Sequence, residues 1–227
     1  MLNLGKPARG LFVKLPSTEV IDLIAASGFD FAVVDLEHSQ LADVDAFRLL
    51  RHAQALDFPA LVRIATAERG LVNRLLEAGA AGIHLSTVHR AAEVTELRKM
   101  CRYAPDGTRS VSLTHPGGRY GGRDLGEYLG AQGLGPIVVA QIETEETEDS
   151  LEEIVAAGPD VLFVGVTDLT VDCELDPARV QARVDEVATA AESAGIPLGA
   201  FSLDDPRVTY AAVSTDLTLL RNAVLGA

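Results

Sequence analysis

Residues 137–165 read IVVAQIETEETEDSLEEIVAAGPDVLFVG, a stretch that predicts one strand, helix and strand of a parallel sheet. Apolar runs rich in β-branched residues stand at Ile137 to Ile142 and Val161 to Gly165, and both have the length of a buried strand. Between them, Asp149 to Ala157 has the composition of an amphipathic helix, and Gly158 suits its end. Because two parallel strands need such a crossover, the stretch favours an α/β fold.

Similar units of roughly 20 to 30 residues recur along the chain. Eight apolar runs favour a single closed (β/α)8 barrel, the TIM barrel, over a doubly wound open sheet, and no Gly-x-Gly-x-x-Gly turn follows the first run. Glycines that suit helix ends are Gly28, Gly79, Gly158 and Gly195. The predicted strands are Leu11 to Leu15, Phe31 to Asp35, Ala60 to Ile64, Gly82 to Leu85, Ile137 to Ile142, Val161 to Gly165, Pro197 to Phe201 and Ala211 to Ser214. The predicted helices include Thr18 to Ser27, Asp43 to Leu56, Ala91 to Cys101, Asp149 to Ala157 and Pro177 to Ala194.

Length and composition fit one domain over residues 1–227, the size of a single barrel. The chain is 48% hydrophobic but has no run long enough to cross a bilayer and no secretory signal, so we expect a soluble cytoplasmic protein. Its two cysteines, Cys101 and Cys173, are expected to be reduced. A formal net charge of −14 disfavours nucleic acid and anionic membranes as partners and favours small-molecule chemistry.

Two carboxylates follow neighbouring predicted strands, at the carboxyl ends where a parallel barrel forms its active site. They are Glu143, in Gln141-Ile142-Glu143-Thr144, and Asp168, in Gly165-Val166-Thr167-Asp168-Leu169. Each acid alone could be a helix cap or a first-turn residue. As a pair, with no histidine or cysteine nearby in sequence, they favour oxygen ligation of Mg²⁺ or Mn²⁺, with Co²⁺ as an alternative.

Acid, base and cationic groups end the second and third predicted strands. His38 has the chemistry to move a proton near neutral pH, and Asp35 stands close enough in sequence to orient its imidazole, with Glu37 between them. Arg63 lies in the apolar run Ala60 to Ile64 and therefore needs an anionic partner. That partner is either an internal carboxylate or the carboxylate or enolate oxygen of a substrate.

The segment Ser110 to Gly135 interrupts the regular spacing and is rich in glycine. Long loops of this kind in compact domains are often lids or binding loops, and the alternative is a surface insertion. The remaining histidines lack acidic neighbours and are assigned structural roles; they are His52, His84, His89 and His115.

Several short motifs stand in an order that is specific as a combination. They are Gly28-Phe29-Asp30 with Val34-Asp35-Leu36-Glu37-His38, Val62-Arg63-Ile64, Gly79-Ala80-Ala81-Gly82-Ile83, Tyr103-Ala104-Pro105-Asp106-Gly107-Thr108-Arg109, Gln141-Ile142-Glu143-Thr144 and Gly165-Val166-Thr167-Asp168-Leu169. Over nearly the whole chain, this set resembles the HpcH/HpaI aldolases, metal-dependent class II pyruvate aldolases that include 2-dehydro-3-deoxyglucarate and 4-hydroxy-2-oxoheptanedioate aldolases.

The resemblance implies a TIM barrel of the phosphoenolpyruvate/pyruvate type and a carbon–carbon lyase that joins or separates a pyruvate-type enolate and an aldehyde. It also implies a homo-oligomer, either a trimer or a hexamer. The site residues that it implies are Glu143 and Asp168 as metal ligands, His38 with Asp35 for acid–base work, Arg63 for the oxo acid, and Gln141 and Thr167 in the substrate pocket.

Departures from the family pattern concern the pocket and the subunit contacts more than the metal. Val166 stands where proline is usual, and Val171-Asp172-Cys173 replaces a turn that contains serine or glycine. The chain ends at Ala227, soon after the last short helix, so a longer exchanged terminal helix is expected to be absent.

Three other functions stay open on the same scaffold. One is a Claisen-type reaction, as in citryl or malyl thioester lyases and siderophore-type citrate synthases. Another is a Schiff-base aldolase, for which only Lys14 of the three lysines stands near a predicted strand end. The last is a relative that binds an oxo acid without turnover.

Overall fold

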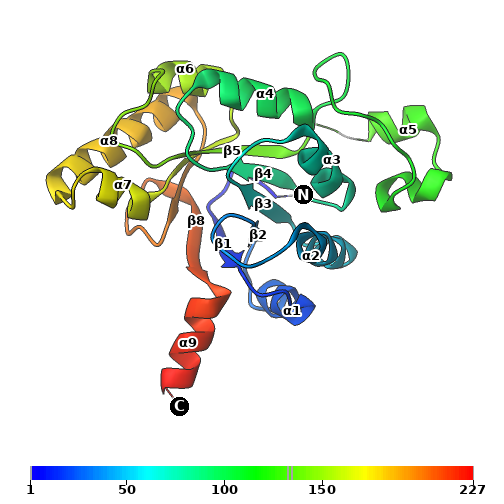
Figure 1. The fold of residues 1–227 in the computed structure, drawn as a ribbon, viewed down its shortest axis with the longest axis horizontal. Coiled ribbons are helices and arrows are strands. Elements are labelled where there is room, and N and C mark those ends of the chain that lie inside the picture. Colours follow the sequence, from blue (N-terminus) through cyan, green and yellow to red (C-terminus); the bar gives the residue numbers. More distant parts are fainter. Residues whose placement is uncertain (1, 132, 134, 227) are drawn as a thin grey trace.

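The computed structural model describes residues 2–131, 133 and 135–226, and in it eight strands close into a barrel in chain order (Figure 1). All neighbouring strands pair in parallel, including the last with the first. The predicted (β/α)8 barrel is therefore confirmed, and the open sheet is excluded. The strands are β1 (Ala8–Val13), β2 (Phe31–Asp35), β3 (Ala60–Ile64), β4 (Gly82–Leu85), β5 (Ile137–Ile142), β6 (Val161–Val164), β7 (Leu198–Phe201) and β8 (Val208–Thr215).

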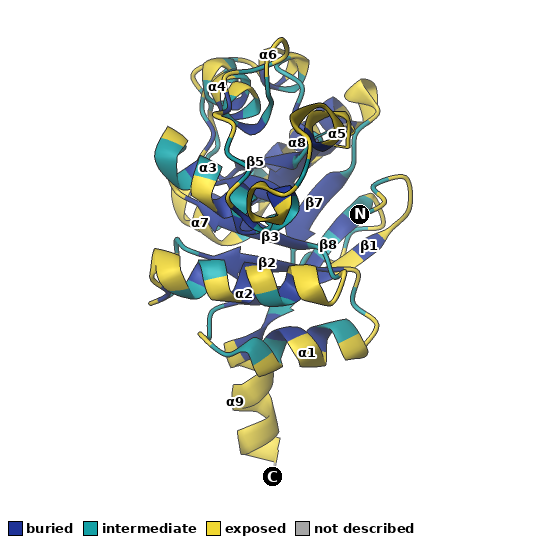
Figure 2. Cartoon of the chain, turned by 90° about the vertical axis from the view of Figure 1, so that its right-hand side faces the viewer, coloured by how far each residue is buried: buried dark blue, intermediate teal, exposed yellow. Residues whose placement is uncertain are grey.

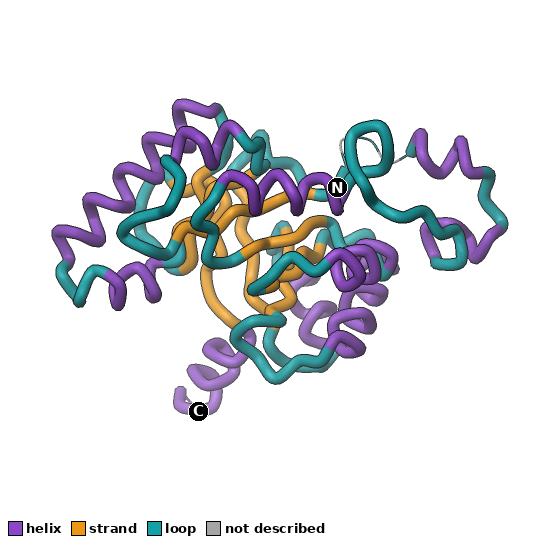
Figure 3. Tube along the Cα trace, turned by 45° about the horizontal axis from the view of Figure 1, so that its top comes forward, coloured by secondary structure: helices purple, strands orange, loops and turns teal. Residues whose placement is uncertain are grey.

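Most helices lie outside the ring of strands, as Figure 3 shows. They are α1 (Thr18–Ala26), α2 (Asp43–Ala55), α3 (Arg69–Glu77), α4 (Ala91–Cys101), the 3-10 helix η1 (Pro116–Gly121), α5 (Leu125–Gly130), α6 (Leu151–Ala156), α7 (Val166–Asp172), α8 (Pro177–Ala194) and α9 (Asp216–Gly226). The four glycines predicted to end helices all have positive φ; they are Gly28, Gly79, Gly158 and Gly195.

Predicted and observed strand bounds agree best in the middle of the chain, where β2, β3, β4 and β5 match residue for residue. The first strand starts earlier than predicted because it pairs with β8 from Ala8 onward, and the exposed Arg9 hid this in the sequence. Gly10 leaves room there for the Phe31 ring, since a Cβ on it would lie 2.2 Å from that ring. The last strand is longer than predicted and includes Tyr210, which stacks on Phe31 at 4.3 Å between ring centroids.

Strands β2 to β6 are buried on both faces, which explains why their sequences are continuous apolar runs (Figure 2). Inside the barrel, Phe12, Phe31, Phe163 and Tyr210 form an aromatic layer. The outer faces of the strands pack with the inner faces of the helices in a second, larger cluster. This rigid frame sets the positions of the side chains that follow each strand. No helix in the described part of the chain is long and apolar enough to span a membrane.

The segment Ser110 to Gly135 connects α4 to β5 and contains η1 and α5. A connection from a helix to the next parallel strand lies at the amino ends of the strands, opposite the expected active site. The segment therefore does not form a lid over the mouth of its own barrel, and it projects beside the barrel (Figure 1).

A helix of 11 residues, α9, follows β8 and points away from the barrel (Figures 1 and 2). Beyond its first residue it is exposed, including Leu217, Leu220 and Val224. These residues are spaced so that they share one face of the helix. The chain thus carries an apolar terminal helix that its own barrel does not cover.

Candidate active site

Asp35 ends β2 and is completely buried between two cations. Arg63, its neighbour on β3, donates from Nε to Oδ1 at 2.9 Å and from Nη2 to Oδ2 at 2.7 Å. Lys14, which directly follows β1, donates from Nζ to Oδ2 at 2.5 Å and to the carbonyl of His38 at 2.7 Å. Of the two partners considered for Arg63, the internal carboxylate is therefore present.

The environment of Asp35 keeps it ionised. Burial by itself raises the pKa of this carboxyl, but hydrogen bonds and charge from Arg63, followed by those from Lys14, outweigh it. The pKa of Asp35 therefore lies well below its usual range. Such an anion holds the two cations in place but is a poor acceptor for a catalytic proton.

His38 lies beside this cluster with its side chain 55% exposed. Oδ1 of Asp35 accepts the backbone N–H groups of Glu37 and His38, both at 3.2 Å. Among the described residues, the carboxylate nearest to the imidazole is Glu37, with Oε2 3.7 Å from Nε2. Asp35 thus orients the backbone of His38, whereas the sequence suggested that it orients the ring.

Glu37 connects the ends of three strands. Its Oε1 accepts a hydrogen bond from the hydroxyl of Ser86 at 2.6 Å, and its Oε2 lies 3.4 Å from Nε of Arg63. The same Oε2 faces His38. Glu37 was recognised in the sequence only as a polar residue at a strand end, and Ser86 was not recognised as part of the site.

Glu143 follows β5 and is only 6% exposed. The hydroxyl of Thr87 donates to its Oε1, and the amide of Gln141 donates to its Oε2. Both donors are neutral, and no cationic side chain in the described part of the chain forms an ion pair with this carboxylate. Buried carboxylates are normally paired with a cation or bound to a metal ion. Among the described residues, Glu143 has no such positive partner.

A completely buried histidine supports this arrangement from inside the barrel. Nε2 of His84, on β4, lies 2.7 Å from Oε1 of Gln141. The His84 ring also packs edge-on against the ring of Phe163, with 4.7 Å between the ring centroids. Burial, and next the charge of Arg63, lower the pKa of His84 to about 3. The ring is therefore neutral, and because the Gln141 amide nitrogen already donates to Glu143, Nε2 of His84 is assigned as the donor. A structural role for His84 was predicted.

Gly165, directly after β6, leaves space for these side chains. A Cβ on it would lie 2.6 Å from Oε2 of Glu143 and 3.0 Å from Nε2 of Gln141. Three residues further on, Asp168 lies exposed in the first turn of α7, with Thr167 also exposed beside it. Because β5 and β6 are paired in parallel, Glu143 and Asp168 belong to neighbouring strand ends.

The donor set at this edge suits an oxygen-loving divalent cation. Among the described residues, no three His, Cys, Asp or Glu side chains gather as a group that could hold a metal ion. Glu143 and Asp168 alone would leave most positions of an octahedral ion to water and substrate, as Mg²⁺ sites commonly do. The set does not resemble a closed structural zinc site.

A cleft of about 370 Å³ opens beside the site, between the loops that follow β3 and β4. Thr66, Ser86, Thr87 and Arg90 are among the residues that line it. Two of these, Ser86 and Thr87, also hold Glu37 and Glu143. A ligand in this cleft would therefore contact the residues that support both carboxylates.

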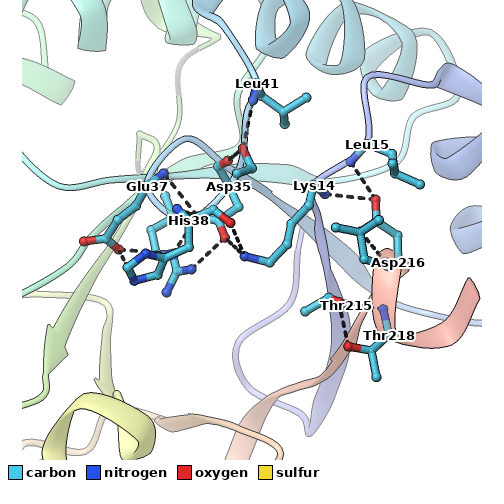
Figure 4. A network of polar contacts seen from close by, with 12 residues as sticks. Lys14, Leu15, Asp35, Glu37, His38, Leu41, Thr215, Asp216 and Thr218 are labelled. Atoms are coloured by element: carbon cyan, nitrogen blue, oxygen red, sulfur yellow. Dashed lines mark hydrogen bonds and ion pairs between the residues drawn. The ribbon is translucent and has the colours of Figure 1, made fainter. Parts of the chain in front are cut away.

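Asp216 is a further residue that the sequence did not reveal. Its Oδ2 accepts the backbone N–H groups of Lys14 and Leu15, both at 2.9 Å (Figure 4). It fixes the end of β1, from which Lys14 reaches Asp35. The available signals were the position of Lys14 near the end of the predicted strand Leu11 to Leu15 and that of Asp216 two residues after the predicted strand Ala211 to Ser214.

Comparison with known proteins identifies the family of this chain. A profile of the family described as HpcH/HpaI aldolase/citrate lyase matches residues 9–211. A hydroxypyruvate/pyruvate aldolase of Paraburkholderia phytofirmans is 31% identical over 209 residues, which cover 87% of this chain and 80% of that protein. A 5-keto-4-deoxy-D-glucarate aldolase of Klebsiella pneumoniae is 30% identical, with 91% of this chain and 84% of that protein covered. The crystal structure of a HpcH/HpaI aldolase/citrate lyase family protein from Burkholderia cenocepacia has a TM-score of 0.87 at 26% identity, covering 97% of this chain and 93% of that one.

Proposed function

The chain belongs to the HpcH/HpaI aldolase/citrate lyase family, and we propose that it is a metal-dependent aldolase acting on a 2-oxo acid and an aldehyde. The observation that carries the metal dependence is Glu143, a buried carboxylate held only by neutral donors and lacking a cationic partner in the described chain. We infer that Glu143 and Asp168 hold Mg²⁺, Mn²⁺ or Co²⁺. Such an ion would stabilise the negative charge that develops on the oxo acid.

Arg63 is placed to bind the oxo acid. Asp35 engages its Nε and Nη2, and none of the described residues accepts a hydrogen bond from Nη1. That nitrogen can donate to the carboxylate or the 2-oxo oxygen of the substrate. Asp35, which also accepts from Lys14, holds the guanidinium in one orientation, so little reorganisation is needed when charge develops. Gln141, fixed by His84, and the exposed Thr167 complete the polar side of the proposed pocket.

His38 is the proposed acid–base group, because its ring is accessible and faces Glu37. In the cleavage direction it takes the proton from the hydroxyl of the aldol adduct. The carbon–carbon bond breaks, its electron pair forms the enolate, and the former hydroxyl carbon leaves as the aldehyde. Protonation of the enolate carbon then gives the 2-oxo acid. In the synthetic direction the same ring returns the proton to the new alkoxide.

Lys14 supports a metal mechanism over a Schiff base. Its Nζ donates to both Asp35 and the carbonyl of His38, and those contacts occupy the nitrogen that would have to attack a carbonyl carbon. The remaining lysines are Lys6, which precedes β1, and Lys99, which lies in α4. Neither follows the carboxyl end of a strand.

Exchange of the methyl hydrogens of pyruvate for deuterium tests the proposal. With Mg²⁺ or Mn²⁺ the protein should catalyse this exchange in D₂O, and Glu143→Gln and Asp168→Asn should abolish it. Glu148→Gln is the matched control, because Glu148 is an exposed acid of the following segment and should leave exchange unchanged. Absence of exchange, together with turnover of an acyl-CoA and oxaloacetate, would instead support the Claisen alternative; binding of pyruvate without either reaction would support a non-catalytic relative.

We further propose that the protein is a homo-oligomer, a trimer or a hexamer, assembled through α9. The exposed apolar face of this helix, with Leu217, Leu220 and Val224, supports the proposal. Leu220→Asp should lower the mass measured by light scattering, whereas Arg221→Asp on a neighbouring exposed position should change it less.

The charge of −14 argues against nucleic-acid and membrane partners, and the two free, buried cysteines support a reducing, cytoplasmic location.

A further inference from the structure

A cavity of about 330 Å³ lies at the amino-terminal end of the barrel, opposite the candidate active site. The starts of β4 and β5 form one wall, through Ala81 and Ile137. The insertion between α4 and β5, whose α5 projects beside the barrel in Figure 1, forms the other wall. The polar residues that matter there are Arg109, His115 and Arg123.

Arg109 is a buried cation without a counterion. It is 8% exposed, and its Nε is enclosed with no hydrogen-bond partner. Within the ranges that the structure describes, its guanidinium forms no ion pair, and its packing partner is the ring of Tyr103, 4.7 Å from Cζ. The other buried arginines differ, because Arg63 is paired with Asp35 and Arg183 with Glu186. A guanidinium cannot shed its charge at ordinary pH, so its burial calls for an anion.

His115 offers a second unpartnered group in the same cavity. It is buried, its Nε2 lies 3.2 Å from the hydroxyl of Tyr128, and its Nδ1 has no partner. If Tyr128 donates to Nε2, then Nδ1 carries the hydrogen and can donate to a ligand. A Cβ on Gly117 would lie 3.3 Å from Nδ1, so glycine keeps the approach to this nitrogen open.

The formal charges around the cavity favour an anion. Arg123 also lines it, with its guanidinium 6.0 Å from the centre of the Tyr128 ring. One carboxylate, Glu77, lines it as well and accepts a hydrogen bond from Asn73 at 3.1 Å. Two arginines against one carboxylate leave this cavity positive, in a chain whose net charge is −14. Charge of this sign, gathered against the overall field, favours anion recognition.

We propose that this cavity is a binding site for a small oxyanion, a phosphate or a carboxylate, held by Arg109 with help from His115 and Arg123. The volume falls within the range of small-molecule pockets, and a guanidinium fork matches two oxygens of such an anion. A bound anion would tie the insertion to the start of β5, the strand whose other end precedes Glu143. The site is separate from the proposed aldolase chemistry and does not depend on it.

Ligand-dependent thermal stability and calorimetry test the proposal with full-length protein. Inorganic phosphate and succinate are titrated in separate arms, with sodium chloride adjusted to keep the ionic strength constant. In at least one arm the wild-type melting temperature should rise in a saturable manner. Arg109→Met should lose this rise without a lower melting temperature in anion-free buffer, because it removes an unpaired buried charge. Arg119→Met is the matched control, since Arg119 is an exposed arginine of the same insertion and should retain the full response.

Two results would overturn the proposal: no response of the wild type in either arm, or an equal response of Arg109→Met. If the wild type does not respond but Arg109→Met reduces the oligomer mass, the counterion is a carboxylate of a second copy and the small-anion site is refuted. If Arg109→Met does not fold, Arg109→Lys and His115→Gln decide. Loss of the fork or of the Nδ1 donor should weaken binding by at least severalfold, and unchanged affinity in both variants would refute the site.

Discussion

Replacing Asp35 by asparagine tests how the site is held together. The change keeps the shape of the side chain but leaves Arg63 and Lys14 facing each other without their shared anion. Removing one partner of a buried ion pair typically costs about 3–5 kcal/mol. For a domain of this size that loss corresponds to a fall in melting temperature of roughly 6–20 °C. Asp43→Asn is the matched control, because Asp43 is also paired with an arginine, Arg74, but is exposed, and its loss should cost less than about 1 kcal/mol.

The stabilising contribution of Asp35 should depend on pH in one direction. Because the pKa of Asp35 is lower in the folded chain than in the unfolded chain, its stabilising contribution is present above the unfolded value of about 4 and is lost as pH falls toward the folded value. The difference in unfolding free energy between wild type and Asp35→Asn, measured in urea, should therefore be full at pH 7 and shrink below pH of about 4. A difference at pH 7 no larger than that of the exposed control, or one that grows on acidification, would refute the described ion pairing.

Further predictions concern the residues around Glu143 and Lys14. His84→Leu removes the hydrogen bond that supports Gln141 and should weaken Mn²⁺ binding about 10- to 100-fold in a titration, the usual effect of losing a group that positions a metal ligand. Unchanged affinity would show that Gln141 needs no such support. Because the pKa of His84 is about 3, its titration should not shape the activity profile between pH 5 and 9. Gly165→Ala places a methyl group against Glu143 and should abolish pyruvate exchange at a stability cost of about 1–3 kcal/mol, measured by denaturation. Borohydride with pyruvate should give no adduct on Lys14 by mass spectrometry, and a stable adduct would contradict the metal mechanism.

Strand positions could be predicted from the sequence wherever a strand is buried on both faces. Continuous apolar runs defined β2 to β5 without error, whereas Arg9 and Thr209 hid the starts of β1 and β8. The position of the insertion between α4 and β5 was also predictable in principle, since a helix-to-strand connection lies at the amino end of the barrel. Its glycine content suggested a lid because composition alone does not tell the two ends of a barrel apart.

Side-chain partners were harder to predict than positions. The strand-end rule found Asp35, His38 and Arg63, but sequence proximity suggested that Asp35 faces the ring of His38. In the fold, strand register places Asp35 beside Arg63, and the stronger charge pairing decides its orientation. Lys14 stands 21 residues from Asp35 in sequence, and the pairing of β1 with β2, in which Val13 lies beside Val34, brings the two side chains together. Such contacts depend on the register of three strands, which no local pattern contains.

Buried charges in this chain divide into those with an internal partner and those without. Asp35 and Arg63 form an ion pair, so each of these buried charges has its counterion within the fold. Glu143 and Arg109 have no such partner among the described residues, and each lies at a different end of the barrel. Burial of an unpaired charge costs several kcal/mol. We therefore infer that each of these two charges binds a group of opposite charge from outside the described chain, which offsets that cost. An anion that lacks a cation predicts a metal ion at Glu143, and a cation that lacks an anion predicts an oxyanion at Arg109. Because the two sites have opposite needs, removal of divalent metal should leave the Arg109 response to phosphate or succinate intact, and loss of that response on metal removal would show that the anion binds at Glu143 after all.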